Sequence, residues 1–194
     1  RYSDQVSTPI SKSKLRAAMR ARRRELARAF PDAAERAAEH LPLEVLPAFA
    51  CFSGYHALAD ELDPSPLIRL LAVTCSIFSF PIADFADAPL IFRAWDSRDT
   101  PITDRFGVPA PPPSASILHP DLIVCPLLAF DRTGARLGQG GGHYDRTIEA
   151  LRAIKPVFVL GLAYAGQKIK EIAAEDHDQR LDAILTESGH MPVS

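Results

Sequence analysis

The sequence has no apolar run long enough to cross a membrane. A spanning helix needs about 20 consecutive apolar residues, and no hydrophobic stretch in the 194 residues approaches that length. Residues 1–14 also contain no apolar segment of the kind that acts as a secretory signal. We therefore expect a soluble, cytoplasmic protein that does not bind membranes.

Cysteine is scarce, with only Cys51, Cys75 and Cys125, each inside an apolar run. Their odd number and wide spacing exclude a disulfide framework and a C-x-x-C metal site, and indicate buried thiols in a reducing compartment. The chain also lacks the composition of a disordered protein, because 47% of its residues are hydrophobic and only 24% are charged. A chain of this length and composition is expected to form one folded domain.

The net charge is only -2, but it is unevenly distributed. Residues 11–30 contain eight basic residues and one acidic residue, a formal charge of +7, and the rest of the chain carries -9. Three interpretations of the basic segment stay open. It binds a phosphate-bearing ligand, it binds nucleic acid, or it is a solvated face packed against the acidic remainder of its own domain.

Helical and strand-like patterns alternate along the chain. Residues 1–10 are expected to form a loose tail, followed by a basic helix that Ser11 or Ser13 caps and that ends before Pro31. Continuous apolar strands separated by helices predict an α/β fold, a mostly parallel sheet flanked by helices in a single three-layer domain over residues 11–194, with ligands at the carboxyl ends of the strands. The expected strands are residues 48–55, 73–80 (ended by Pro81), 90–95, 121–130, 156–163 and finally 182–186, and the other helices are residues 33–41, 65–72 and about 144–153.

Residues 130–146, FDRTGARLGQGGGHYDR, form the segment with the clearest chemical signal. Five glycines lie between an expected strand and an expected helix, where backbone N–H groups can bind phosphate, although a mobile surface loop is the competing interpretation. The segment has neither the Gly-Lys-Ser/Thr ending of a P-loop nor the third glycine of a dinucleotide fingerprint. Arg136 can pair with phosphate oxygens, and Asp145 is placed for a Mg²⁺ ion bridged to phosphates.

This segment resembles the corresponding loop of the 5-formyltetrahydrofolate cyclo-ligases. Family members read approximately P-x-x-x-F-D-x-x-G-x-R-L-G-x-G-x-G-Y-Y-D, and residues 126–145 read PLLAFDRTGARLGQGGGHYD. The resemblance extends over residues 12 to about 187, because three shorter motifs follow in the family's order. The first motif, K-x-x-L-R, is matched by Lys12, Leu15 and Arg16. An acidic motif after the first strand is matched by Glu61, Leu62 and Asp63. A closing motif is matched by His177, Asp178, Leu181 and Asp182.

The resemblance implies an ATP- and Mg²⁺-dependent ligase that cyclises 5-formyltetrahydrofolate, with or without a polyglutamate tail, to 5,10-methenyltetrahydrofolate. Arg136, Tyr144 and Asp145 would act in catalysis, and Asp145 and Asp182 would hold the metal. Glu61, which could otherwise be a solvated acid before a helix, would bind the pterin together with His143 and Tyr144. Residues implied to bind ATP are Lys12, Arg16, Arg136, Gly138, Gln139, Gly140, Gly141, Gly142 and Asp145.

Four positions depart from the family's pattern. Gln139 and Gly141 stand where a basic residue is frequent, His143 replaces the first tyrosine of Y-Y-D, and Ala110 stands where glutamate is usual. These departures leave open a homologue that binds folate and ATP but is catalytically impaired. A nucleic-acid-binding module that uses the basic helix is the second alternative, although that helix has no interleaved aromatic residues. We expect no nucleic-acid partner, and a monomer rather than an oligomer.

Overall fold

A computed structural model describes residues 11–96, 98 and 100–193 of the chain. The expected tail, residues 1–10, lies outside the described residues. Among the described helices, none combines the length and the apolar character that crossing a membrane requires.

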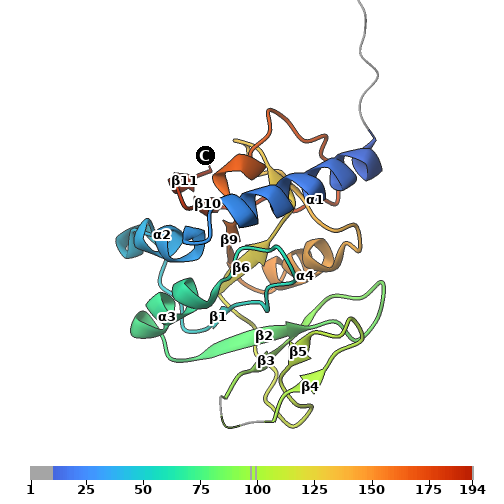
Figure 1. Ribbon diagram of the computed structural model, residues 1–194. Coiled ribbons are helices and arrows are strands. Elements are labelled where there is room, and N and C mark those ends of the chain that lie inside the picture. Colours follow the sequence, from blue (N-terminus) through green and yellow to red (C-terminus); the bar gives the residue numbers. More distant parts are fainter. Residues whose placement is uncertain (1–10, 97, 99, 194) are drawn as a thin grey trace, which may run out of the picture.

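A seven-stranded sheet occupies the centre of the fold (Figure 1), in the order β11-β10-β9-β6-β1-β2-β3. The five inner strands, from β10 to β2, are parallel, and the strand at each edge is antiparallel to its neighbour. This arrangement confirms the predicted mostly parallel sheet. The strands are β1 (Phe52–Ser53), β2 (Phe78–Ile82), β3 (Ile91–Ala94), β6 (Leu122–Pro126), β9 (Phe158–Leu162), β10 (Ala183–Thr186) and β11 (Gly189–Pro192).

The alternation of side chains along the central strand β6 explains the three layers. Leu122 and Val124 point to one face of the sheet, where they share a core with α1 (Lys12–Ala29), α2 (Ala33–Glu39) and α3 (Ser65–Thr74). Ile123 and Cys125 point to the other face and pack with α4 (His143–Arg152). Because helices cover both faces, the strand is apolar at every position, as its sequence predicts.

Two small hairpins lie outside the main sheet, one of β4 (Ile102–Thr103) with β5 (Pro109–Ala110), the other of β7 (Ala129–Phe130) with β8 (Arg136–Leu137). The prediction of a single strand over residues 121–130 is therefore wrong, because the strand of the main sheet ends at Pro126 and residues 129–130 pair with β8 instead. Gly134 forms the turn of the second hairpin at φ +78°, and a Cβ there would lie 2.6 Å from the Leu181 carbonyl oxygen. Two single-turn 3₁₀ helices, η1 (Leu43–Val45) and η2 (Ala165–Gln167), complete the described elements.

The boundaries of two other predicted strands are corrected. Residues 48–55 form ladder pairs only at Phe52–Ser53, and the segment predicted as a strand from residue 73 continues α3 to Thr74. Pro81 does not end β2 but lies inside it. The Ser79 carbonyl accepts from the Gly54 N–H on the β1 side, and the backbone nitrogen of Pro81 faces that same side beyond the end of β1. No ladder bond is therefore lost to proline at this position.

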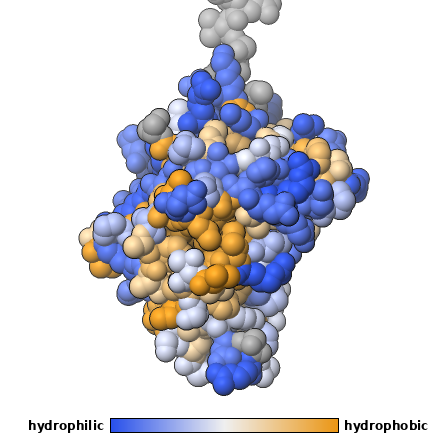
Figure 2. Space-filling model, turned by 90° about the vertical axis from the view of Figure 1, so that its left-hand side faces the viewer, coloured by the Kyte–Doolittle hydropathy of each residue, from blue (hydrophilic) through white to orange (hydrophobic). Residues whose placement is uncertain are grey.

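The last strand of the sheet was not predicted. β10 corresponds to the predicted strand 182–186, but the chain then turns through two residues and returns as β11, where Thr186 pairs with Gly189. On the side of α2 and α3, Figure 2 shows apolar side chains gathered at the surface. Val45 in η1, Val73 in α3 and Ile77 just before β2 are exposed. This surface lies on the opposite face of the sheet from α4.

Candidate active site

The glycine loop, residues 138–142, leads from β8 into α4 at the carboxyl side of the parallel strands. Gly140 (φ +110°) and Gly142 (φ +65°) adopt backbone conformations that favour glycine. Gly142 is the N-cap of α4, and its helix has no side-chain cap. Among the described residues, nothing accepts a hydrogen bond from the N–H groups of the first three helical residues, His143–Asp145. Such a helix start favours the binding of an anion such as phosphate.

Helix α1 lies across the glycine loop. The Arg16 Nε donates to the Gly138 carbonyl at 3.1 Å, and the Arg20 Nε donates to the Gln139 Oε1 at 2.9 Å. A Cβ at Gly140 would lie only 3.4 Å from the Arg16 guanidinium carbon. The structure thus brings the basic helix and the glycine loop together, as their predicted shared role requires. Arg20 is an additional contact that the sequence motifs did not single out.

Lys12, at the start of α1, contacts the closing motif rather than the loop itself. Its Nζ lies 2.9 Å from both Glu175 Oε1 and Asp178 Oδ2. Burial opposes the charge of Lys12, but the two carboxylates outweigh it, so the pKa of Lys12 is raised. Burial likewise acts to raise the pKa of Asp178, yet the Glu175 N–H and Lys12 lower it overall. Both groups are therefore held in their charged forms.

Asp145, in the first turn of α4, is fixed by two donors on one oxygen. Its Oδ1 accepts from the Arg136 Nη2 at 2.8 Å and from the Gln179 N–H at 2.9 Å. The Arg136 Nη1 also donates to the Gln179 carbonyl. Because the Arg136 side chain is only 4% exposed, it faces Asp145 rather than the surface of the loop. A direct contact between Arg136 and a phosphate would require these partners to shift.

A pocket of about 210 Å³ opens beside Asp145 and the glycine loop. Asp145 Oδ2 has no hydrogen-bond partner among the described residues. The lining residues are Asp87, Gly140, Gly141, Gly142, Asp145, Arg146, Glu149 and His177. A larger pocket, about 410 Å³, lies at the β2–β3 edge near Trp95, but none of the predicted site residues lines it.

Asp182 does not lie beside Asp145, which corrects the expected pair of metal ligands. The Asp182 Oδ2 accepts from the Arg152 Nη2 at 2.8 Å and from the Val159 N–H at 2.7 Å. Arg152 ends α4 and Val159 is at the start of β9, so Asp182 lies at the opposite end of α4 from Asp145. In the same segment of the chain, Asp178 is the carboxylate on the Asp145 side, because the next residue, Gln179, donates to Asp145.

Glu61 lies in the loop that follows β1, in a buried ion pair with α1. Its Oε1 is 3.3 Å from the Arg23 Nη1, and its Oε2 accepts from the Leu58 N–H at 3.0 Å. The Glu61 side chain is 6% exposed, so the interpretation as a solvated acid is wrong. Burial raises the pKa of Glu61, and the bonds from Leu58 and Arg23 offset this only in part.

His143 and Tyr144 begin α4, directly after the glycine loop, and Tyr144 interacts with Glu61. Burial raises the pKa of the Tyr144 hydroxyl well above its ordinary value, and the nearby Cys125 and Glu61 add to the shift. The His143 Nδ1 is 2.9 Å from the Ala88 carbonyl, which requires a proton on that nitrogen. Its ring meets Phe106 edge-on at 5.7 Å. Tyr144 therefore lies close to Glu61, as their expected shared substrate requires, and His143 is held at the entrance to α4.

The chain is similar to known proteins over most of its length. Residues 9–187 match the model of the 5-formyltetrahydrofolate cyclo-ligase family. A 5-formyltetrahydrofolate cyclo-ligase of Mycolicibacterium smegmatis is 31% identical over 92% of this chain and 95% of its own, and one of Escherichia coli is 30% identical over 81% and 87%.

Two solved structures share the fold. The 5,10-methenyltetrahydrofolate synthetase of Aquifex aeolicus has a TM-score of 0.71 at 23% identity, over 95% of this chain and 93% of that one. The synthetase of Mycoplasma pneumoniae has a TM-score of 0.67 at 21% identity, over 92% and 99%. The fold and the glycine loop define an α/β enzyme in which an uncapped helix start follows the loop. The chain belongs to the 5-formyltetrahydrofolate cyclo-ligase family.

Proposed function

We propose that this protein converts 5-formyltetrahydrofolate to 5,10-methenyltetrahydrofolate with ATP and Mg²⁺, releasing ADP and phosphate. The observation that carries the proposal is the convergence of α1, the glycine loop and the start of α4. Arg16 and Arg20 reach the loop from α1, and the uncapped start of α4 offers N–H groups from within it. Cationic side chains and helix amides on one loop fit the triphosphate of a nucleotide.

The reaction needs ATP because the formyl oxygen is a poor leaving group. Transfer of the γ-phosphoryl group to that oxygen releases ADP and leaves an iminium phosphate at the formyl carbon. N10 then attacks this carbon and loses its proton, the C–O bond breaks, and phosphate leaves as the methenyl bridge forms. The protein supplies no nucleophile in this scheme. It aligns donor and acceptor and stabilises the charge on the transferred group.

The proposed phosphate contacts come from Lys12, Arg16 and the loop. Lys12 already has two carboxylate partners, so an ATP phosphate would join or replace them. Arg136 contributes by holding Asp145, its partner at 2.8 Å. The proposed backbone and side-chain contacts to ATP from the loop are Gly138, Gln139, Gly140, Gly141 and Gly142.

The residues around Asp145 fit a magnesium ion. Mg²⁺ prefers hard oxygen ligands and is held by one or two carboxylates together with substrate phosphates. Asp145 offers its free Oδ2 beside the loop, and Glu175, His177 and Asp178 form a group whose ligand atoms lie within 4.8 Å of one another. When bound, Mg²⁺ neutralises charge on the phosphates. Asp145 and Asp178 would hold it, and Asp182 would not.

The proposed folate contacts come from Glu61, Tyr144 and His143. A carboxylate is the natural acceptor for the pterin's amino and ring N–H groups. Glu61 is nearly enclosed, and its pKa is raised mainly by burial, so bonds from a donor-rich ligand would stabilise its charged form. Tyr144 lies near enough to Glu61 for that carboxylate to raise the pKa of the Tyr144 hydroxyl.

The helix α1 also bears on the nucleic-acid alternative. Arg16, Arg20, Arg22 and Arg23 all contact other parts of the protein. With Lys12, which pairs with Glu175 and Asp178, five of the helix's eight basic residues contact other parts of the protein. Lys12, Arg16 and Arg20 among them reach the closing motif or the glycine loop, which supports a role inside the enzyme.

The direct test is the formation of the methenyl product, followed by its absorbance. Purified protein is mixed with 5-formyltetrahydrofolate, ATP and Mg²⁺, and each component is omitted in turn. We expect turnover only in the complete mixture, with one ADP formed per product. Binding of both substrates without product would instead identify a catalytically impaired homologue, the alternative that Gln139, Gly141, His143 and Ala110 suggest. Binding of neither substrate would refute the proposal.

A further inference from the structure

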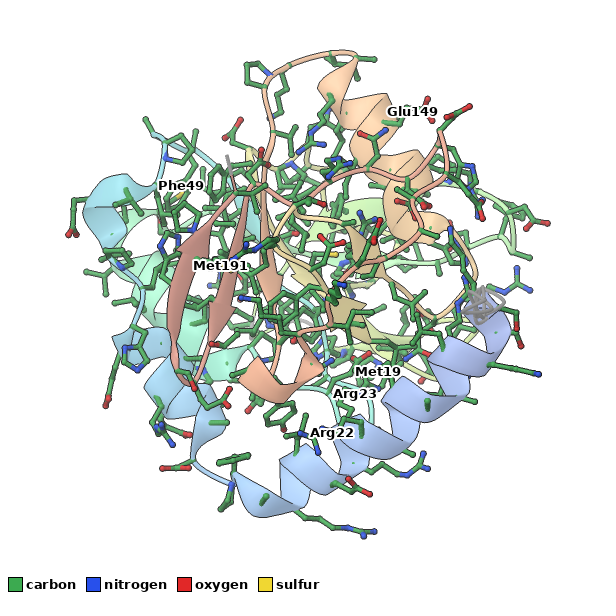
Figure 3. The ribbon with its side chains drawn as sticks, turned by 90° about the horizontal axis from the view of Figure 1, so that it is seen from above. Met19, Arg22, Arg23, Phe49, Glu149 and Met191 are labelled. Carbon is green, nitrogen blue, oxygen red and sulfur yellow. The ribbon has the colours of Figure 1, made fainter. Side chains whose placement is uncertain are left out.

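Arg23 is a buried arginine in the middle of a solvated basic run. Its side chain is 5% exposed, whereas that of Arg22, the residue before it, is 53% exposed. Figure 3 shows Arg23 and Met19 on the side of α1 that faces the sheet. Arg23 follows Arg16 by seven residues, or about two helical turns, so it lies on the same face of α1 as the arginines that contact the glycine loop.

The guanidinium of Arg23 is fully engaged in this position. Nε donates to Asp60 Oδ2 at 3.1 Å, and Nη2 lies 3.5 Å from Asp60 Oδ1, so the fork is bidentate. Nη1 donates to Glu61 Oε1 at 3.3 Å and to the Leu127 carbonyl at 3.4 Å. One rigid group therefore connects α1, the loop after β1 and the end of β6.

The cluster contains both charged and neutral groups. Arg23 faces two carboxylates, Arg24 also lowers the pKa of Asp60, and the other titratable groups that interact with Glu61 are neutral. Burial acts to raise the pKa of Asp60, but Arg23 outweighs it and lowers that pKa. For Glu61 the balance is opposite, and burial keeps its pKa raised in spite of Arg23. The neutral neighbours are Tyr55 from the segment after β1, Cys125 from β6 and Tyr144 from α4.

We propose that Arg23 is a positioning residue of the folate site, which orients the Glu61 carboxylate and keeps it ionised. The inference rests on the proposed function, because Glu61 is the proposed acceptor for the pterin. Asp60 supports this role, because its bidentate bond fixes the plane of the Arg23 guanidinium and directs Nη1 at Glu61. Stability alone is a weak reason for such a cluster, because well-packed apolar side chains often stabilise a protein as well as a buried ion pair does.

The test compares Arg23→Met, Arg23→Lys and the control Arg22→Met. Arg22 is adjacent on α1, and its contacts are a weak bond to the Gly166 carbonyl at 3.5 Å and Glu25 at 4.0 Å. The pKa of Glu61 is measured by carbon NMR of carboxyl-labelled glutamate, with its signal assigned by its loss in Glu61→Gln. The dissociation constant of 5-formyltetrahydrofolate is measured by calorimetry between pH 5.5 and 8.5, and the KM values for folate and ATP are compared.

In Arg23→Met we expect the pKa of Glu61 to rise above its wild-type position. Folate affinity should then fall about tenfold for each pH unit below that pKa and recover as the pH increases, because the carboxylate form binds. Arg23→Lys keeps the charge but cannot hold both carboxylates. It should restore the wild-type pH profile with an affinity loss of about fivefold, the effect of one hydrogen bond. Arg22→Met should match the wild type.

An unchanged pKa of Glu61 in Arg23→Met would overturn the proposal, and so would a loss of folate affinity that is equal at every pH. If Arg23→Met does not fold, Arg23→Lys decides, because equal increases in the KM for ATP and for folate would indicate a merely structural role. The NMR titration needs no folate. If the wild type fails to bind 5-formyltetrahydrofolate while the Glu61 pKa still depends on Arg23, the proposed function fails and the positioning of Glu61 stands.

Discussion

Asp145 and Asp182 provide a matched pair of substitutions at the two ends of α4. Each carboxylate accepts from one arginine and one backbone N–H, Asp145 from Arg136 and Gln179, and Asp182 from Arg152 and Val159. Asp145→Asn and Asp182→Asn therefore remove the same charge from nearly the same bonding pattern. Only Asp145 lies beside the glycine loop. The two variants separate the effect of a lost ion pair from the effect of a lost metal ligand.

The structure sets the expected magnitudes. The single oxygen of asparagine can still accept both bonds, but neither bond is then charge-assisted, which costs about 1–3 kcal/mol of unfolding free energy. For a chain of this length that lowers the Tm by roughly 2–12 °C. Asp145→Asn should lose slightly more stability than Asp182→Asn, because its partner Arg136 is 4% exposed whereas Arg152 is 28% exposed.

The two variants should differ in enzymatic activity. Asp145→Asn is expected to lower turnover by more than about 100-fold and to require more Mg²⁺. Substituting a residue that only supports a metal ligand costs roughly 10–100-fold, so a larger loss indicates a direct ligand. Asp182→Asn should retain turnover within about twofold, measured below its Tm. Calorimetric melting and a Mg²⁺ titration of methenyl formation give both quantities. A higher Mg²⁺ requirement in Asp182→Asn than in Asp145→Asn would refute the placement of the metal site.

Three further changes test other parts of the site. Lys12→Ala should raise the KM for ATP roughly tenfold or more and leave that for folate nearly unchanged, because the lost contact is to phosphate; a rise in the folate KM alone would contradict this assignment. Glu61→Gln should weaken 5-formyltetrahydrofolate binding by ~1–3 kcal/mol, about five- to more than hundredfold, because an amide accepts at one oxygen only. Equal dissociation constants of wild type and variant by calorimetry would exclude Glu61 from the pterin site. Gly134→Ala should destabilise the fold by about 2–3 kcal/mol, from its left-handed φ and the strained Leu181 contact, and an unchanged Tm would show that the turn relaxes freely.

The local patterns of the sequence predicted the layers, and the family resemblance implied that the basic helix and the glycine loop act together. Alternation and apolar continuity in residues 122–126 reflect burial on both faces, which is a local property of the strand. The regular spacing of Leu15, Met19 and Leu26 marks the inner face of α1. Arg23 follows Arg16 by seven residues and lies on that same face. The spacing therefore indicates that Arg23, one of three consecutive arginines, is buried, whereas composition alone indicates that all three are solvated.

The position of Asp182 had no such signal. Residues 168–182 contain no helix or strand, so no periodicity relates Asp178 and Asp182 to α4. The end of α4 that each carboxylate meets depends on the long-range bonds of this segment, such as that from the Gln179 N–H to Asp145. The β7–β8 hairpin was missed for a related reason. The apolar residues of β7 continue the pattern of β6, so the only local sign of a hairpin is the turn at Gly134 between β7 and β8.

The helix α1 sets a fixed distance and a fixed rotation between the two proposed binding sites. Its Arg16 reaches the glycine loop and its Arg23 reaches Glu61, and the helical rise separates these residues by about 10 Å along the axis. Inserting one residue between them would turn the second contact by about 100° around the helix, away from its partner. We expect exchanges at outward positions such as Arg24 to be tolerated, and changes in the length of the segment between Arg16 and Arg23 not to be. Differences in length among related enzymes are therefore expected before Lys12 or after Ala29, where an insertion would not change the spacing between Arg16 and Arg23.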